Sequence, residues 1–231
     1  MPHFFGTSTG QRPGSLPGHQ RSHLMEENMF GIEALHWFAG QTWNTALDIG
    51  SGAGEQALYL TDADPLRHVI TLDSRNQGAM YNVPYLIYAP AQQYDAIWCS
   101  HVLEHQVDPG CFLHKIYDDV VDGGPIAITV PPLKHEIVGG HVSLWNPGLL
   151  AYHLILAGFD LKEAEIWQYG YNISACFRKT PIDDMPHLMN DSGDIERLKN
   201  YFPATWPIHE GFHGSNIVNG NADGSPYKAP T

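Results

Sequence analysis

The first segment with chemical potential is a glycine-rich run after a short apolar stretch. Gly50, Gly52 and Gly54 alternate with small residues, and Asp48 precedes the first glycine by two positions. Glycine has no Cβ, so the backbone amides of such a loop can approach a ligand closely at the start of a helix. The spacing differs from the G-x-G-x-x-G of dinucleotide-binding folds. An acid this near the loop favours a cationic or hydroxylated ligand group over a pyrophosphate.

A second acidic side chain, Asp73, follows the next apolar run, His68–Leu72. At the carboxyl end of a strand, a carboxylate can accept hydrogen bonds from both hydroxyls of a ribose. The loop and this acid together predict a cofactor that contains a nucleoside. A tight turn without a ligand and a nicotinamide site are the two alternatives.

Histidines form the third chemical feature. His101, Glu104 and His105 have the spacing i, i+3, i+4, which would place them on one face of a helix. His135 and His141 come in a later loop, expected to roof a pocket at the carboxyl edge of the sheet. Three interpretations stay open: local hydrogen bonding, a general base at His101 or His141, and a divalent metal. Such a mixed ligand set would suit zinc, manganese or iron better than magnesium.

These residues need a framework, and strand-like and helical segments alternate through the middle of the chain. The predicted strands are Thr45–Ile49, His68–Leu72, Tyr85–Tyr88, Tyr94–Cys99, Pro125–Val130, Asp160–Trp167 and Asn172–Arg178. The predicted helices are Met25–Phe38, a segment from the glycine loop to Leu60, Val102–Val121, Leu149–Ala157 and Asp194–Phe202. This alternation predicts an α/β fold with a mostly parallel sheet, and the short last connection predicts one antiparallel strand.

Five segments in this order resemble the successive motifs of class I S-adenosylmethionine-dependent methyltransferases: LDIGSGAG, VITLDS, YDAIWCSHVLEH, GGPIAITVPP and LILAGFD. The resemblance spans about residues 45–180. It implies a Rossmann-like, seven-stranded, mostly parallel sheet of order 3-2-1-4-5-7-6, with strand 7 antiparallel and helices on both faces. It also implies S-adenosyl-L-methionine as the cofactor and S-adenosyl-L-homocysteine as the product.

The same resemblance implies roles for individual residues. The segment Asp48–Gly54 would hold the methionine end of the cofactor and Asp73 the ribose, while Ser100 and His101 would lie beside the methyl group. Residues 89–92 lack the acid that many members place near the adenine, which leaves Gln92, Gln93 and backbone groups as candidate contacts there, of which Gln92 is the predicted one. The predicted cofactor-binding residues are therefore Asp48, Gly50, Ser51, Gly52, Gly54, Asp73, Ser74, Gln92, Ser100 and His101.

The histidine set is similar to the Glu-x-x-Glu-His plus distant His of small-RNA 2′-O-methyltransferases and some ubiquinone-pathway O-methyltransferases. His101 stands where those families have the first Glu, and the metal candidates are His101, Glu104, His105 and His141. The preferred interpretation needs no metal. It predicts methyl transfer to a small-molecule or sugar acceptor at oxygen, with His101 or His141 as the base. A non-catalytic cofactor-binding module is the remaining alternative.

Composition limits the partners. The 231 residues include 12 Lys and Arg against 25 Asp and Glu, a net charge of −13, which disfavours nucleic acid. The three cysteines are far apart and form no zinc or disulfide pattern. No signal peptide or spanning apolar run is found, so we expect a cytoplasmic protein without a membrane partner. We expect an N-terminal arm (1–24), a methyltransferase domain (25–180) and an extension (181–231) that packs on the domain or on a partner subunit, as in a homodimer.

Overall fold

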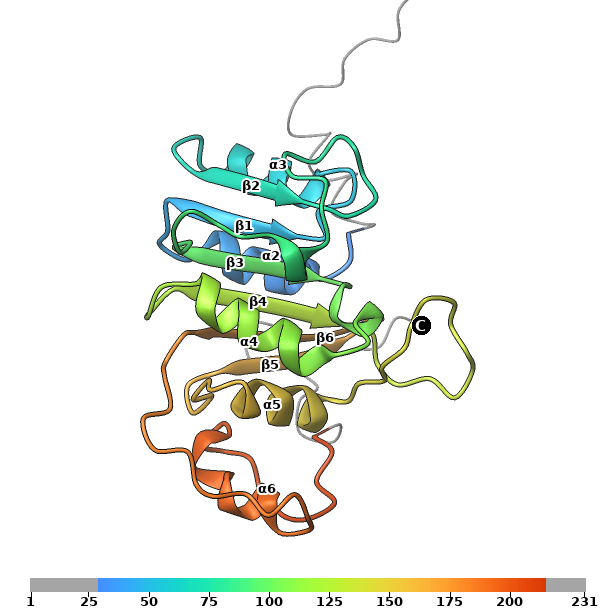
Figure 1. The fold of residues 1–231 in the computed structure, drawn as a ribbon, viewed down its shortest axis with the longest axis vertical. Coiled ribbons are helices and arrows are strands. Elements are labelled where there is room, and N and C mark those ends of the chain that lie inside the picture. Colours follow the sequence, from blue (N-terminus) through green and yellow to red (C-terminus); the bar gives the residue numbers. More distant parts are fainter. Residues whose placement is uncertain (1–28, 215–231) are drawn as a thin grey trace, which may run out of the picture.

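A computed structural model of the protein describes residues 29–214, so the predicted arm 1–24 lies outside the described residues. Its centre is a six-stranded sheet with the order β2-β1-β3-β4-β6-β5 (Figure 1). The strands are β1 (Thr45–Ile49), β2 (His68–Leu72), β3 (Ala96–Ser100), β4 (Pro125–Val130), β5 (Glu165–Tyr169) and β6 (Asn172–Arg178).

Of the six strands, β1 to β5 run in the same direction, and β6 runs opposite to them. β1 pairs with β2 and β3, and β3 pairs with β4, all in parallel register. β6 is antiparallel to both β4 and β5. The predicted Rossmann-like α/β class and its antiparallel late strand are confirmed. The carboxyl ends of β1 to β4 therefore meet at one edge, where ligands bind in open α/β sheets.

Helices cover both faces of the sheet, as Figure 1 shows. The α-helices are α2 (Ile32–Ala39), α3 (Glu55–Ala63), α4 (Pro109–Asp119), α5 (Pro147–Leu156) and α6 (Asp194–Arg197). The 3-10 helices are η1 (Tyr85–Ile87), η2 (Leu103–His105) and η3 (Lys199–Tyr201). One core forms where α4 and α5 bury residues such as Phe112 and Leu154. The other forms where α2 and α3 bury Leu35 and Leu60.

The predicted strand at Tyr85–Tyr88 is wrong, because these residues form η1 instead. Pro84 precedes η1 and has no amide hydrogen to donate to a sheet ladder. A single parallel bridge at Tyr81 takes the place of the strand: its amide donates to the Thr71 carbonyl, and its carbonyl accepts from the Asp73 amide. The sheet thus has six strands rather than the seven predicted.

The predicted helix Val102–Val121 is also wrong as one element. It divides into η2 and α4, and the second begins where Asp108 accepts a hydrogen bond from the Cys111 amide at 2.9 Å, with Pro109 at the first helical position. This Asp-Pro pair is a helix-start signal visible in the sequence. Among the other predicted elements, β5 begins only at Glu165, and α2 begins at Ile32.

The last described segment, residues 181–214, packs against the same domain. Leu198 and Phe202 are buried in the core that includes α5. None of the helices in residues 29–214 combines the length and apolarity needed to cross a membrane.

Candidate functional site

The glycine loop joins β1 to α3 and has both a crowded and an open side. Gly50, Gly52 and Gly54 all have positive φ values, of 74°, 52° and 82°, which disfavour residues with a Cβ. A Cβ at Gly50 would overlap the Val102 side chain. Around Gly52 and Gly54 a Cβ would meet nothing within 4 Å. The loop is therefore packed against Val102 at its first glycine, whereas at the next two glycines the space that a Cβ would occupy is open.

Asp73 lies at the carboxyl end of β2 and is held by backbone amides. Its carboxylate accepts hydrogen bonds from Gly52 at 2.9 Å, from Arg75 at 2.7 Å and from Asn76 at 2.8 Å. Partial burial alone would raise the pKa of Asp73, but these donors and the charge of Arg75 bring it below the ordinary value of 3.8. Asp73 is thus an ionised acceptor, fixed against the glycine loop.

Asp48, in β1, has the opposite surroundings. It is 1% exposed, and neither carboxyl oxygen has a hydrogen-bond partner within the described residues. Burial, together with the nearby charge of Asp73, raises the pKa of Asp48 to about 7.

Further partnerless groups line the same edge of the sheet. Within residues 29–214 the buried hydroxyls of Ser51 and Ser100 and both oxygens of Glu104 make no hydrogen bond. Native proteins leave few buried polar groups unpaired, and each needs an explanation. Because these groups follow the ends of β1 and β3, the explanation that fits is a ligand at the carboxyl edge.

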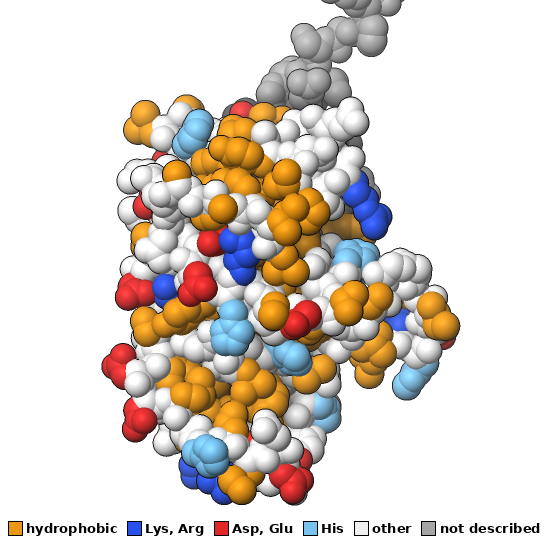
Figure 2. Space-filling view, viewed as in Figure 1, with side chains coloured by type: hydrophobic (Ala, Val, Ile, Leu, Met, Phe, Trp, Pro, Cys, Tyr) orange, Lys and Arg blue, Asp and Glu red, His pale blue; other side chains and the backbone are white. Residues whose placement is uncertain are grey.

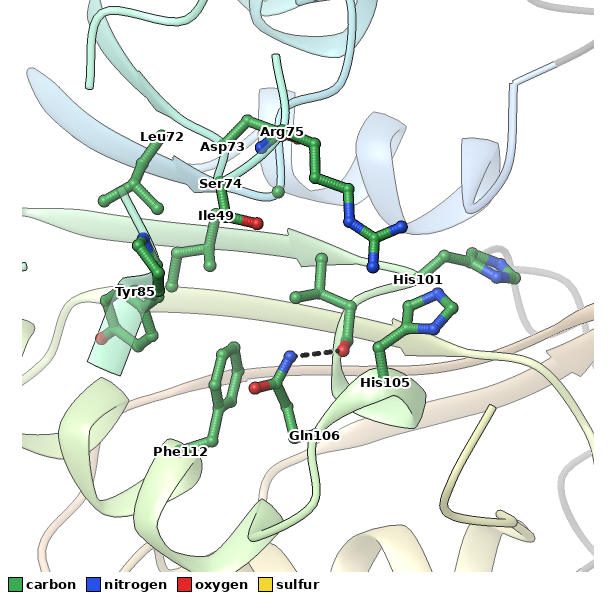
Figure 3. Close-up of a pocket in the computed structure, with 13 residues that line it drawn as sticks. Ile49, Leu72, Asp73, Ser74, Arg75, Tyr85, His101, His105, Gln106 and Phe112 are labelled. Carbon is green, nitrogen blue, oxygen red and sulfur yellow. Dashed lines mark hydrogen bonds between the residues drawn. The ribbon is translucent and has the colours of Figure 1, made fainter. Parts of the chain in front are cut away.

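A cavity of about 350 Å³ opens beside Asp73 (Figure 3). The rings of Tyr85 and Phe112 lie at one end of it, and His101 and His105 lie at the other. Its polar lining includes Ser74. The cavity combines a flat apolar slot with a polar rim, as a nucleoside requires.

A second hollow of about 280 Å³ lies on the other side of the glycine loop. Its lining includes Ser51, Gly52, Ser100 and the aromatic ring of Phe30. Gly50 and His101 line both spaces. His101 therefore lies at the junction of the two cavities.

The His101 side chain is held by partners at both ring nitrogens. Its Nε2 lies 2.9 Å from Asn172 Oδ1, which also accepts the Gly31 amide at 3.0 Å. An oxygen cannot donate, so Nε2 carries a proton. The other nitrogen, Nδ1, lies 3.3 Å from Glu104 Oε1. His101 has a left-handed φ of 55°, uncommon for a residue with a side chain and frequent at functional sites.

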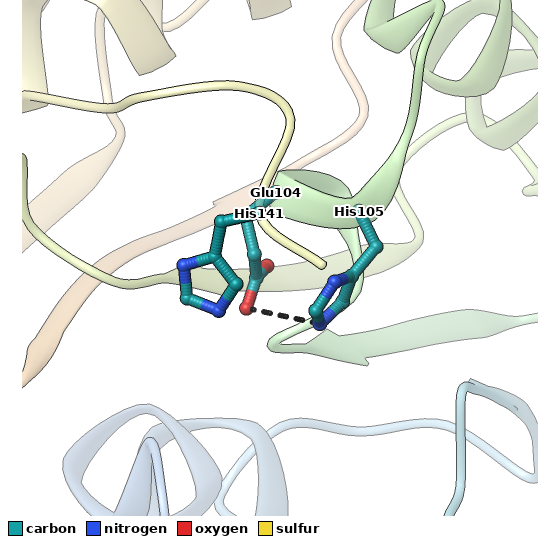
Figure 4. Close-up of side chains that lie close together, drawn as sticks. All are labelled: Glu104, His105 and His141. Carbon is teal, nitrogen blue, oxygen red and sulfur yellow. Dashed lines mark ion pairs between the residues drawn. The ribbon is translucent and has the colours of Figure 1, made fainter. Parts of the chain in front are cut away.

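Glu104, His105 and His141 form a compact cluster next to this junction (Figure 4). One potential ligand atom from each lies within 4.8 Å of the others. His105 Nδ1 lies 2.7 Å from the Gly140 carbonyl, which makes Nδ1 the donor and leaves Nε2 with a lone pair when the ring is neutral. That Nε2 is 3.8 Å from Glu104.

The structure brings most predicted site residues to this edge, but not in the predicted way. The i, i+3, i+4 histidine set does not share an α-helical face, because His101 is outside η2. Gln92 is exposed and lines neither cavity, and the neighbouring Gln93 donates to the Asp118 and Val120 carbonyls at the start of β3. The predicted adenine contact at Gln92 is therefore at the opposite edge of the sheet.

Residues at the site that were not predicted include Phe30, Tyr85, Phe112, Tyr171 and Asn172. Tyr85 was assigned to a strand, although Pro84 before it was a signal against that assignment. Asn172 begins β6, and no local pattern connects it to His101, 71 positions earlier.

Comparison with known proteins identifies the class. A family model described as a methyltransferase domain matches residues 19–193. The chain therefore belongs to the methyltransferase-domain family, and the predicted resemblance to the S-adenosylmethionine-dependent methyltransferase family is confirmed. Among curated proteins, no sequence match was found.

Solved structures share the fold at low sequence identity. The mitomycin 7-O-methyltransferase MmcR is 16% identical, with a TM-score of 0.51 over 71% of this chain and 58% of that one. The methyltransferase SibL is 17% identical, with a TM-score of 0.52 over 71% and 57%. The Burkholderia thailandensis 1,6-didemethyltoxoflavin-N1-methyltransferase is 14% identical, with a TM-score of 0.51 over 74% and 93%. This chain thus spans less than two thirds of the length of the first two proteins.

Proposed function

We propose that this protein transfers the methyl group of S-adenosylmethionine to an oxygen of a small-molecule or sugar acceptor, with a histidine taking the proton. The observation that carries the proposal is a set of buried groups at the carboxyl edge that make no hydrogen bond within residues 29–214, namely Asp48, Ser51, Ser100 and Glu104. Ser51 and Ser100 line one cavity together with His101, and Glu104 Oε1 lies 3.3 Å from the His101 ring.

The residues fit the cofactor. S-adenosylmethionine supplies an electrophilic methyl group on a positively charged sulfur. Asp73 would accept the ribose hydroxyls, and the slot beside Tyr85 and Phe112 would take the adenine. The open backbone at Gly52 would receive the methionine end, next to the Ser51 hydroxyl, which makes no hydrogen bond within the described part of the chain. Two structural neighbours are named for small molecules, mitomycin and 1,6-didemethyltoxoflavin, which supports a small-molecule acceptor.

Of the two histidines predicted as bases, the hydrogen bonds favour His141. His101 Nε2 already donates to Asn172, and Glu104 Oε1 lies 3.3 Å from its Nδ1, so each ring nitrogen already faces a polar atom of the protein. The His141 ring makes no hydrogen bond within residues 29–214, and it lines a pocket in the loop after β4. We assign His141 the proton transfer and His101 the positioning of the junction.

Calorimetry and a methyl-transfer assay test this function. We expect S-adenosylmethionine to bind the full chain and Asp73→Ala to weaken that binding by about tenfold or more. His141→Gln should reduce turnover while leaving cofactor affinity unchanged. Absence of cofactor binding would overturn the proposal, and binding without methylation across small hydroxylated metabolites and sugars would support a non-catalytic module.

A metal-assisted variant of the same reaction is the second candidate. The observation that favours it is Glu104, which is fully buried, makes no hydrogen bond to any described residue and lies 3.8 Å from His105 Nε2. A buried carboxylate needs a compensating cation. Glu104, His105 and His141 would hold a divalent ion, and His101 would stay outside the set as a neighbour of Glu104. Zinc or manganese matches these ligands better than magnesium.

Metal titration separates the two candidates. If the metal is used, zinc or manganese should bind one site per chain, and His105→Gln should abolish that binding. His114→Gln is the matched control, because His114 is exposed on α4 away from the cluster. Full activity after chelation, with no metal bound, would reject the metal and leave His141 as the base.

A further inference from the structure

The loop after β4 encloses a third cavity that the cofactor does not need. Residues 131–145 fold toward Tyr171 around a space of about 210 Å³. In Figure 1 this loop projects from the carboxyl edge of the sheet, beyond the rest of the domain. The cavity shares no lining residue with the two spaces at the glycine loop. It is therefore a separate pocket, which we call the loop pocket.

The loop pocket lies next to the junction at His101. Tyr171 lines the loop pocket, and its ring is stacked at 26° on His101 with 6.1 Å between ring centres. The ring of Phe30, which lines the hollow at the glycine loop, is centred 4.5 Å from that of His101 and 6.5 Å from that of Tyr171. These three neighbouring rings connect the lining of the loop pocket with that of the hollow at the glycine loop. An acceptor in the loop pocket would thus adjoin the proposed methyl-transfer position.

The lining of the loop pocket is more apolar than polar. Trp145 is buried in its wall, and its indole donates to the Ser143 hydroxyl, which itself donates to the Leu103 carbonyl. That hydroxyl therefore has little capacity left for a sugar. Four large apolar side chains on the loop are exposed to water: Leu133, Ile137, Val142 and Leu144. Figure 2 shows hydrophobic surface on this lobe. Apolar exposure of this kind around a pocket indicates an apolar ligand.

A lysine places positive charge in the same wall. Lys134 Nζ lies 4.2 Å from the centre of the Tyr171 ring. Within the described residues Lys134 makes no ion pair, although its exposed neighbour Glu136 also lines the pocket. A cation beside an aromatic wall lowers the free energy of a developing phenolate oxygen. The same cation would stabilise the oxygen of an alkyl alcohol much less, because an alkyl alcohol does not ionise near neutral pH.

We propose that the loop pocket takes a planar aromatic ring that carries the hydroxyl to be methylated. The inference rests on the proposed function. The acceptor oxygen forms the bond to the methyl carbon, the carbon–sulfur bond breaks with its electron pair left on sulfur, and the hydroxyl proton passes to His141. Tyr171 forms the wall nearest the cofactor, and Lys134 stabilises the oxygen as it loses its proton. The substrate class is thus a phenol or a hydroxylated heteroaromatic compound.

The test uses the full chain with S-adenosylmethionine and a panel of hydroxybenzoates and hydroxynaphthoates, each paired with its ring-saturated counterpart. Binding is followed by ligand-observed NMR, and methylation by mass spectrometry. We expect aromatic members to bind and be methylated at oxygen, and saturated members and methyl glucoside to fail. Tyr171→Leu and Lys134→Gln should lower kcat/KM at least tenfold with cofactor affinity unchanged. Lys162→Gln is the matched control, because Lys162 also lies over a tyrosine ring, that of Tyr201, but lines neither the loop pocket nor the two spaces at the glycine loop.

The outcomes separate this inference from the proposed function. If the wild-type chain does not bind S-adenosylmethionine, the proposed function itself is rejected. Normal cofactor binding with equal use of saturated and aromatic acceptors would overturn the aromatic pocket alone. The same holds if no aromatic member of the panel binds, or if Tyr171→Leu and Lys134→Gln behave like Lys162→Gln.

Discussion

Asp73 and Asp48 lie on adjacent strands of one site, yet their surroundings are opposite. Asp73 receives three backbone amides, and its pKa lies below the ordinary value. Asp48 receives none within the described residues, and burial raises its pKa to about 7. Asp73 therefore has hydrogen-bond partners without a ligand, whereas the buried Asp48 has none within the described residues. In such a site, the hydrogen bonds of Asp73 hold the shape of the loop, and the buried polar groups are left for the ligand to pair with.

The largest effect is expected at Gly50, the first glycine of the loop after β1. Gly50→Ala would overlap Val102 and force a Cβ into a left-handed conformation. We expect a loss of about 2 to 6 kcal/mol in the free energy of unfolding. Denaturant unfolding measures it. Gly123→Ala is the control, because Gly123 has a similar φ of 78° and a Cβ there would meet no atom within 4 Å. Equal losses in both variants would show that Gly50 is not packed against Val102.

Asp48 should give the next largest effect, through pH. Its folded pKa of about 7 exceeds the ordinary 3.8, so its contribution to stability is fully present below about pH 4 and is lost as the pH rises through 7. The loss approaches about 4 kcal/mol. Asp48→Asn should flatten this part of the thermal stability profile between pH 4 and 8 in the cofactor-free protein. Exposed Asp62→Asn should not, and an unchanged profile in Asp48→Asn would contradict the assignment.

Gly52 tests whether the open side of the loop is where the ligand lies. A Cβ there meets no protein atom within 4 Å, so Gly52→Ala should cost about as much stability as Gly123→Ala, roughly 1 kcal/mol. If a ligand approaches the bare backbone, affinity for S-adenosylmethionine should fall about tenfold or more in Gly52→Ala alone. Calorimetry compares the two variants. Unchanged affinity in Gly52→Ala would show that the cofactor does not bind against the loop.

The smallest effect is expected at Gln92. Because Gln92 is exposed and lines neither cavity beside the glycine loop, Gln92→Ala should alter cofactor affinity by less than about twofold. Calorimetry with S-adenosylmethionine checks this. A large loss would restore the adenine contact that the sequence suggested and would require residues 89–92 to move.

The glycine loop and Asp73 were predictable because each of them immediately follows its own strand. Local order therefore decides where Asp48, Gly50, Gly52 and Asp73 lie once β1 and β2 pair. The rudimentary outer strand was not predictable, since the pairing of Tyr81 with Leu72 depends on how the chain returns to the sheet edge. The split of the long helix was readable from Asp108 and Pro109.

The amino-acid sequence by itself was enough to predict the fold class, the family and the residues proposed to bind the cofactor, because those signals are contiguous. Only the tertiary structure decided that His141 reaches Glu104, and that Asn172 fixes the proton on His101. These partners come from separate segments of the chain. Their distances are set by the packing of the loop after β4 and of the β5–β6 hairpin against the sheet, which no local periodicity encodes.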